Sequence, residues 1–178
     1  MNVDREHLAE SGGIRAQAGV QAVFGAAALI VGAAAIAESL NALGVIDNGS
    51  ASGADYAFRT LLIVSAVIVM LLVGLSAPVM ALSRRLAAAA TTPAAILFIV
   101  AVAGLCIGRF YAYDAYYAPS RIRFGGSDGF SSSFVVSAVA LDLAAAALLY
   151  RWPRLAFAVL FPGLMMSAFY VFAAGLGH

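Results

Sequence analysis

Five apolar runs separated by short polar segments make up most of this 178-residue chain. The runs are continuous and do not alternate between apolar and polar positions, which favours helices over strands. Each run is about long enough to cross a hydrocarbon layer of ~30 Å as a helix that rises ~1.5 Å per residue. The pattern therefore predicts an all-α, polytopic transmembrane helix bundle with about five membrane-spanning helices, roughly four to six being compatible with the run lengths.

The breaks between the runs divide a single domain, residues 1–178, into spans and loops. The spans are predicted at about residues 17–40, 60–83, 94–110, 133–150 and 155–176. Exposed loops are expected at residues 41–59 and 110–132. Pro78 predicts a bend in the second span and Pro162-Gly163 a break in the fifth, because proline lacks the N–H that a helix interior needs. Thr92 followed by Pro93 is typical of a helix N-cap and first residue.

Small residues recur at helical spacing on the first and third runs. In the first run they stand every seven positions, at Ala18, Gly25, Gly32 and Ser39. In the third run, Gly104 and Gly108 are separated by about one turn. Because small residues let helix backbones approach closely in lipid, we expect Gly25, Gly32, Gly104 and Gly108 to lie at helix-packing faces.

The end of the first run admits a second interpretation. Ala35-Ile36-Ala37 fits a signal-peptidase site. We favour a membrane span, because the run is longer than the usual apolar core of a signal peptide and three acidic residues precede it.

Composition places most of the chain in a lipid environment. The chain is 63% hydrophobic and 11% charged, with a mean hydropathy of +0.97, whereas soluble domains are about one quarter charged. The net charge of +1 indicates no polyanionic partner, so we expect the lipid bilayer and no nucleic acid.

The residue inventory excludes several chemistries. The chain has no lysine, which excludes a Walker-type phosphate loop and a Schiff-base site. Cys106 is the single cysteine, and the two histidines, His7 and His178, stand at opposite ends, so we expect no metal ligands and no cofactor. Residues 125–129 fit the G-x-S-x-G pattern, but the sequence does not indicate the elbow and histidine base that this motif needs, and we predict no catalytic residue.

Asp142 stands near the middle of the fourth span, and Arg109 stands at the end of the third. An ionised aspartate at that depth costs about 2.5–3.5 kcal/mol, so Asp142 is expected to face protein or water. One interpretation makes it an intramembrane proton or ion site, with Arg109 as the nearby basic candidate. The other, which we favour, makes it a structural carboxylate hydrogen-bonded to a serine, tyrosine or arginine of another helix.

Glu38, near the end of the first span, also has two interpretations. It can form an ion pair with Arg59 across the first loop, or it can be a solvated charge at a helix end. We favour the solvated charge, because exposed ion pairs contribute only ~0–1 kcal/mol.

The longest polar break, residues 109–134, combines aromatic and arginine side chains. Tyrosine is enriched at the lipid–water boundary, which makes an interfacial belt one interpretation. Tyrosine and arginine are also typical anchors of protein interfaces, and long loops are commonly functional. The candidate partner-contact residues are Tyr113, Tyr116, Tyr117, Arg121, Arg123 and Phe124.

The distribution of arginine predicts the orientation in the cell membrane. With five spans, six arginines fall on the N-terminal side and four on the other. The six are Arg5, Arg15, Arg84, Arg85, Arg151 and Arg154. The positive-inside rule then places the N-terminus in the cytoplasm, and the loop 110–132 and the C-terminus outside.

Three functions are compatible with these features. We favour a non-catalytic accessory or oligomer-forming membrane subunit whose outer loop, 109–134, contacts a protein partner or a second copy. The second is a small channel or transporter that uses Asp142. The third is a membrane enzyme acting on lipid or quinone at the outer face through Arg109, Asp114, Arg121 or Arg123. Paired acids, a histidine base and metal ligands are not indicated, so we do not expect an enzyme.

Overall fold

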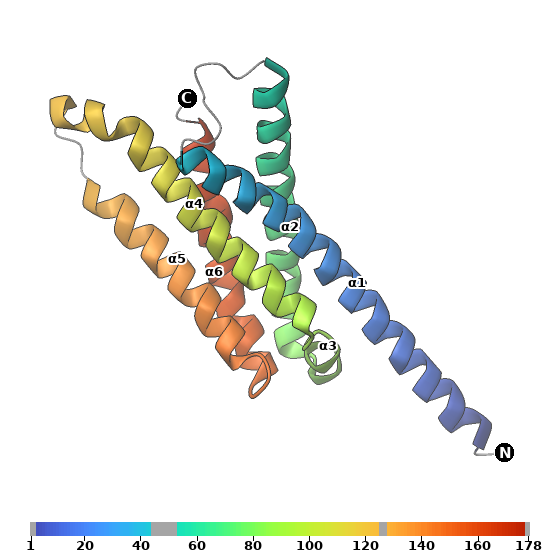
Figure 1. Ribbon diagram of the computed structural model, residues 1–178. Coiled ribbons are helices and arrows are strands. Elements are labelled where there is room, and N and C mark those ends of the chain that lie inside the picture. The colour runs from blue at the N-terminus through green and yellow to red at the C-terminus, as the bar shows by residue number, and fades with distance from the viewer. Residues whose placement is uncertain (1–2, 44–52, 125–127, 177–178) are drawn as a thin grey trace.

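The computed structural model describes residues 3–43, 53–124 and 128–176, and the side chains of residues 17–43, 57–112 and 132–174. Its described part is built of α-helices and contains no strand. The helices are α1 (Val3–Ala42), α2 (Gly53–Leu82), α3 (Arg84–Ala89), α4 (Pro93–Phe124), α5 (Asp128–Leu148) and α6 (Pro153–Leu176). The long helices run up and down in a bundle, and the short α3 lies at the same end as the turn between α5 and α6 (Figure 1).

Within the described residues, four helical segments are long and apolar enough to span a membrane. They are Gln17–Ala42, Ala57–Leu82, Pro93–Ala112 and Pro153–Ala174. A fifth apolar segment, Ser132–Leu148 in α5, is shorter. The prediction of an all-α, membrane-type helix bundle is therefore confirmed.

Several predicted boundaries differ from the structure. The expected loop 110–132 is wrong for residues 110–124, because α4 continues to Phe124 and α5 begins at Asp128. Likewise, residues 53–59 of the expected first loop already belong to α2. Both predictions followed the loss of apolar residues. Polarity marks where a helix leaves apolar surroundings, and it does not by itself end the hydrogen bonding of the helix.

Neither internal proline divides a helix. Pro78 lies inside α2 and Pro162 inside α6, and both helices continue through them. The break predicted at Pro162-Gly163 is therefore wrong. Neighbouring helices in an apolar bundle stabilise a helix around the one hydrogen bond that a proline removes.

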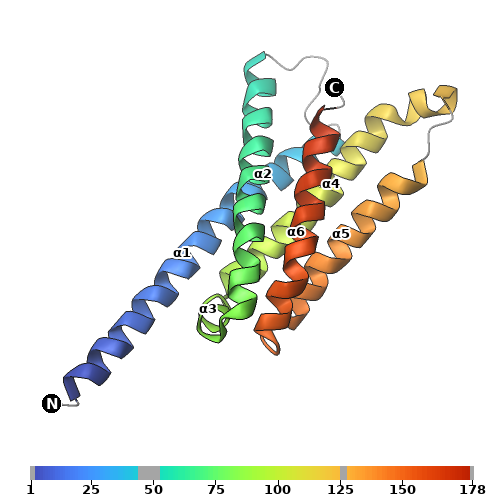
Figure 2. The same cartoon turned by 180° about the vertical axis from the view of Figure 1, so that it is seen from behind.

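Helix pairs define the bundle. α1 packs mainly against α4, α2 mainly against α6, and α5 against both α6 and α4, so α6 lies in contact with α2, α4 and α5 (Figures 1 and 2). The apolar core includes Phe24 of α1. Its ring centroid lies 5.9 Å from that of Phe98 in α4 and 6.5 Å from that of Phe157 in α6. All three rings are almost completely buried.

Side-chain caps fix the sharp connection between α2 and α4. The Ser83 hydroxyl accepts the N–H of Leu86 at 3.4 Å and begins α3. The Thr92 hydroxyl accepts the N–H of Ala95 at 3.3 Å, and Pro93 follows as the first residue of α4. The helix start predicted at Thr92-Pro93 is confirmed.

The predicted packing glycines divide into two pairs. Gly104 and Gly108 of α4 face α1, where a Cβ at Gly108 would lie 3.0 Å from the Ser39 Oγ and 3.3 Å from the Ser39 backbone nitrogen. At Gly25 and Gly32 of α1, an added Cβ would meet no atom of another described helix within 4 Å. The second pair therefore makes no packing contact with the described part of the chain.

These environments predict opposite effects of the same substitution. Gly25→Ala should raise the free energy of unfolding by up to ~1 kcal/mol, since alanine is the better helix former and meets no atom of another described helix. Gly108→Ala should show no such gain. Its free energy of unfolding should fall by ~1–3 kcal/mol, because the new Cβ presses on the α1 backbone. Denaturant unfolding of both variants in the same detergent measures the difference, and equal stabilities would contradict the α1–α4 packing.

Candidate functional site

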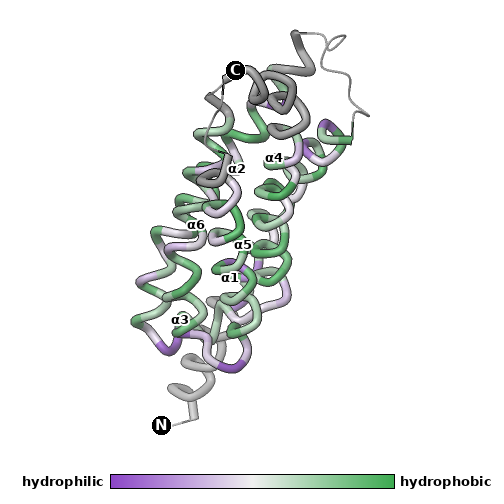
Figure 3. The backbone as a smooth tube through the Cα atoms, turned by 90° about the vertical axis from the view of Figure 1, so that its left-hand side faces the viewer, coloured by the Kyte–Doolittle hydropathy of each residue, from purple (hydrophilic) through white to green (hydrophobic). Residues whose placement is uncertain are grey.

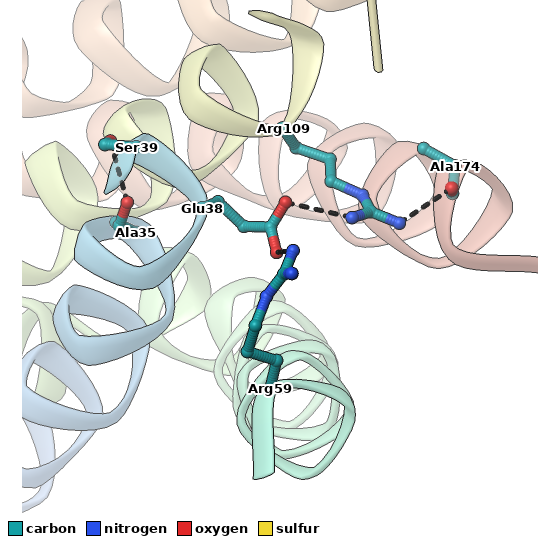
Figure 4. Close-up of polar contacts among 6 residues, drawn as sticks. All are labelled: Ala35, Glu38, Ser39, Arg59, Arg109 and Ala174. Atoms are coloured by element: carbon teal, nitrogen blue, oxygen red, sulfur yellow. Dashed lines mark hydrogen bonds and ion pairs between the residues drawn. The ribbon is translucent and has the colours of Figure 1, made fainter. Parts of the chain in front are cut away.

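A buried ion-pair cluster lies near the end of the bundle where α1 terminates. Glu38 is completely buried. Its Oε1 accepts a hydrogen bond from Nη2 of Arg59 in α2 at 3.2 Å, and its Oε2 accepts one from Nη1 of Arg109 in α4 at 2.9 Å (Figure 4). The favoured sequence interpretation, a solvated charge at a helix end, is wrong. The pair with Arg59 is present, and a second guanidinium joins it.

The periodicity of α1 explains why Glu38 points inward. Val31, Ala34 and Ala35 are buried, and they stand seven, four and three residues before Glu38. Residues at these spacings share one face of an α-helix. Since α1 continues to Ala42, the glutamate is held on that face and is not at a free helix end.

Arg109 extends the cluster to a fourth helix. Its Nη2 donates a hydrogen bond at 2.8 Å to the carbonyl oxygen of Ala174, near the end of α6 (Figure 4). The last carbonyls of a helix have no helical N–H partner and carry partial negative charge, so a guanidinium is favourable there. One carboxylate and two guanidiniums thus join α1, α2, α4 and α6.

Small side chains make room for the cluster. Gly108 precedes Arg109 and lets the α4 backbone approach Ser39 on α1. The Ser39 hydroxyl donates to the carbonyl of Ala35 at 2.8 Å, so it is satisfied within α1 and does not compete for Glu38 (Figure 4). The close approach of the two backbones places Arg109 within reach of the carboxylate.

Asp142 forms a second polar contact inside the bundle. It is completely buried in α5, and its Oδ2 accepts a hydrogen bond from the Ser167 hydroxyl of α6 at 2.7 Å. The Cys106 side chain of α4 adjoins Ser167, so the contact lies where three helices meet. A serine of another helix is the partner that the structural interpretation of Asp142 expects.

Gly163 gives Asp142 its space. A Cβ at Gly163 would overlap the Asp142 Oδ1, and it would lie 3.2 Å from the Cβ of Leu141. Among the described residues, that Oδ1 has no hydrogen-bond partner. The glycine therefore serves close packing of α5 on α6.

The structure does not pair Arg109 with Asp142. Arg109 bonds Glu38 and Ala174, whereas the Asp142 carboxylate bonds Ser167. The two residues of the candidate intramembrane site thus belong to separate clusters. Their roles in proton or ion movement stay predictions.

The candidate partner-contact residues fall in the last turns of α4. Tyr113, Tyr116, Tyr117, Arg121, Arg123 and Phe124 have a helical backbone, and their side chains lie outside the described residues. Their contact with a partner stays a prediction.

Comparison of the chain with protein-family models, curated proteins and solved structures finds no match. Among the residues that the structure describes, no three His, Cys, Asp or Glu side chains are grouped so that they could hold a metal ion. The function is therefore inferred from the geometry.

Sequence reasoning missed two features that complete these clusters. The inward position of Glu38 could have been found from its spacing to Val31, Ala34 and Ala35 in an extended α1. Ser167 could have been found as a small hydroxyl residue within the fifth apolar run, suited to bond a carboxylate on a neighbouring helix.

Removing the shared carboxylate should destabilise the bundle strongly. Glu38→Gln leaves two guanidiniums without their counter-charge, so the free energy of unfolding should fall by about 3–5 kcal/mol. Arg85→Gln is the control, because it also changes the net charge by one unit but at an exposed position. Its free energy of unfolding should stay within ~0.5 kcal/mol of that of the parent chain. Unfolding in a common detergent compares them, and similar stabilities of both variants would show that the cluster does not hold the helices.

The contact between Gly163 and Asp142 predicts non-additive effects. Gly163→Ala should lower the free energy of unfolding by ~1–3 kcal/mol, because its Cβ displaces the buried carboxylate. In an Asp142→Ala background the same change should cost at least ~1 kcal/mol less, since the displaced group is absent. A double-mutant cycle measures this coupling, and purely additive effects would argue against the contact.

Proposed function

We propose that this chain is a non-catalytic, multi-pass membrane subunit that assembles with a second copy of itself through the outward face of α1. The observation that carries the proposal is the open space around Gly25 and Gly32, where no atom of another described helix lies within 4 Å of an added Cβ. Small residues of a membrane helix are typical of faces that another helix approaches closely.

The position of α1 in the bundle supports this assignment. Of its most apolar window, 28% of the residues are buried, against 33% for the corresponding window of α2 and 50% for those of α4 and α6. The bundle contacts use a neighbouring side of α1, roughly 100–140° around the helix from the two glycines, which carries Phe24, Val31 and Glu38. The face around Gly25 and Gly32 is therefore open, whereas Ser39 at its far end packs against Gly108 of α4.

The spacing of the small residues suits a symmetric pair. Ala18, Gly25 and Gly32 are seven residues apart, a repeat that keeps one face along a left-handed helix crossing. Residues 17–37 carry no charge, so two copies of this face do not repel each other. Two-fold pairing needs only one self-complementary surface and is the commonest form of assembly.

The proposal also includes the orientation of the chain in the membrane and a second contact through the end of α4. The arginines of α3 and of the α5–α6 turn favour the cytoplasm for their end of the bundle. The composition of residues 113–124 supports a further contact with the neighbouring copy on the opposite side.

The other two functions have weaker support. A channel or transporter centred on Asp142 needs that carboxylate to be accessible, whereas it is buried, bonded to Ser167 and packed against Gly163. Of the residues named for an enzyme at the outer face, Arg109 is buried and bonded to Glu38 and Ala174, so it is not free to hold an anionic headgroup.

A leucine on the outward face of α1 should prevent assembly. The purified chain in lipid nanodiscs is expected to be dimeric, and Gly25→Leu/Gly32→Leu should make it monomeric by blocking close approach. Gly19→Leu is the matched control. It introduces the same side chain into open space, but roughly 120–140° around the helix from the other two positions.

Subunit counting by single-molecule photobleaching measures the copy number for all three chains. A monomeric parent chain would overturn the self-assembly proposal. So would a dimer that survives both leucines, or one that Gly19→Leu disrupts equally.

A further inference from the structure

Four arginines gather at the end of the bundle opposite the Glu38 cluster. Arg84 and Arg85 begin α3, and Arg151 and Arg154 stand on either side of Trp152-Pro153 at the start of α6. All four side chains are exposed. We refer to these four residues as the arginine rim.

Contacts between the helices hold the two halves of the rim together. The Nε of Arg154 donates to the carbonyl oxygen of Ala81, in the last turn of α2, at 2.8 Å. α3 packs against both α2 and α6. Figure 3 shows hydrophilic segments of the tube at this end, beside α3, and mostly hydrophobic segments above them.

The positive charge of the rim has no counter-charge among the described side chains. The ion pairs between described residues involve Glu38 at the other end of the bundle, and no described carboxylate pairs with a rim arginine. The sequence has no acidic residue between Asp55 and Asp114 and none after Asp142. The acids that precede the first span belong to the beginning of α1, which extends away from the bundle (Figures 1 and 2).

The surroundings of the rim are those of a lipid–water boundary. Trp152 is 52% exposed and Leu86 is 43% exposed, directly beside the arginines. Tryptophan favours this boundary, and a leucine there suits contact with acyl chains. The Arg151 guanidinium lies 5.2 Å from the centre of the Trp152 ring, which orients its N–H groups before any ligand binds.

We propose that the arginine rim binds the phosphate groups of anionic phospholipids in the leaflet at this end of the bundle. Guanidinium groups bond phosphate oxygens in pairs, and this geometry favours arginine for the task. The adjoining Trp152 and Leu86 assign the phosphate to a lipid, because a free anion would gain nothing from them. This binding is independent of the proposed assembly through α1.

Lipid competition on the purified full-length chain tests the proposal. The chain in detergent is mixed with equal amounts of phosphatidylglycerol and phosphatidylcholine, and native mass spectrometry counts the bound lipids. The parent chain should retain phosphatidylglycerol at least ~10-fold in excess, since each arginine near an anionic lipid contributes about fivefold. No preference for phosphatidylglycerol would overturn the proposal.

Two double variants separate the rim from general charge effects. Arg84→Gln/Arg85→Gln removes two side chains that make no hydrogen bond or ion pair with described residues, so the fold is retained and the preference should fall about tenfold or more. Arg121→Gln/Arg123→Gln removes the same charge near the far end of α4 and should keep the preference. Equal losses in both variants, or displacement of the lipid by an equal concentration of inorganic phosphate, would overturn the assignment to a lipid at the rim.

Discussion

A charge inside an apolar bundle must be neutralised there, and the structure depends on how this is done for Glu38. One carboxylate accepts hydrogen bonds from Arg59 and Arg109, and Arg109 also bonds the end of α6. Since lipid offers no water to replace these partners, the four helices involved are confined to one arrangement. The arrangement also requires the absence of a side chain at Gly108, which lets the α4 backbone approach α1 closely.

Two further polar contacts extend the same constraint along the bundle. Asp142 and Ser167 join α5 to α6 near their middle, where Gly163 leaves room for the carboxylate. Arg154 joins α6 to the last turn of α2 at the other end. On the outside of the bundle, Gly25 and Gly32 meet no other described helix, and the rim arginines are exposed. These are the surfaces that we propose for a second copy and for lipid.

The sequence predicted the parts that follow from local patterns. Continuous apolar runs indicated membrane helices, Thr92-Pro93 indicated a helix start, and the depth of Asp142 indicated a hydrogen bond to another helix. The position of Glu38 depended on which turn of α1 ends the helix and on arginines 21 and 71 residues away. The pair with Arg59 was one of the two interpretations of Glu38, whereas the contact with Arg109 has no local signal in the sequence. The extension of α4 to Phe124 was missed because polarity was taken as the end of the helix.

Solid-state NMR of the chain in lipid bilayers tests the shared carboxylate most directly. With ¹³C at the Glu38 side chain and ¹⁵N in the arginine guanidiniums, the account predicts dipolar contacts from the Glu38 carboxyl carbon to both Arg59 and Arg109. A Glu38 carboxyl carbon that contacts neither guanidinium, or that contacts only the guanidinium of Arg59, would contradict the account.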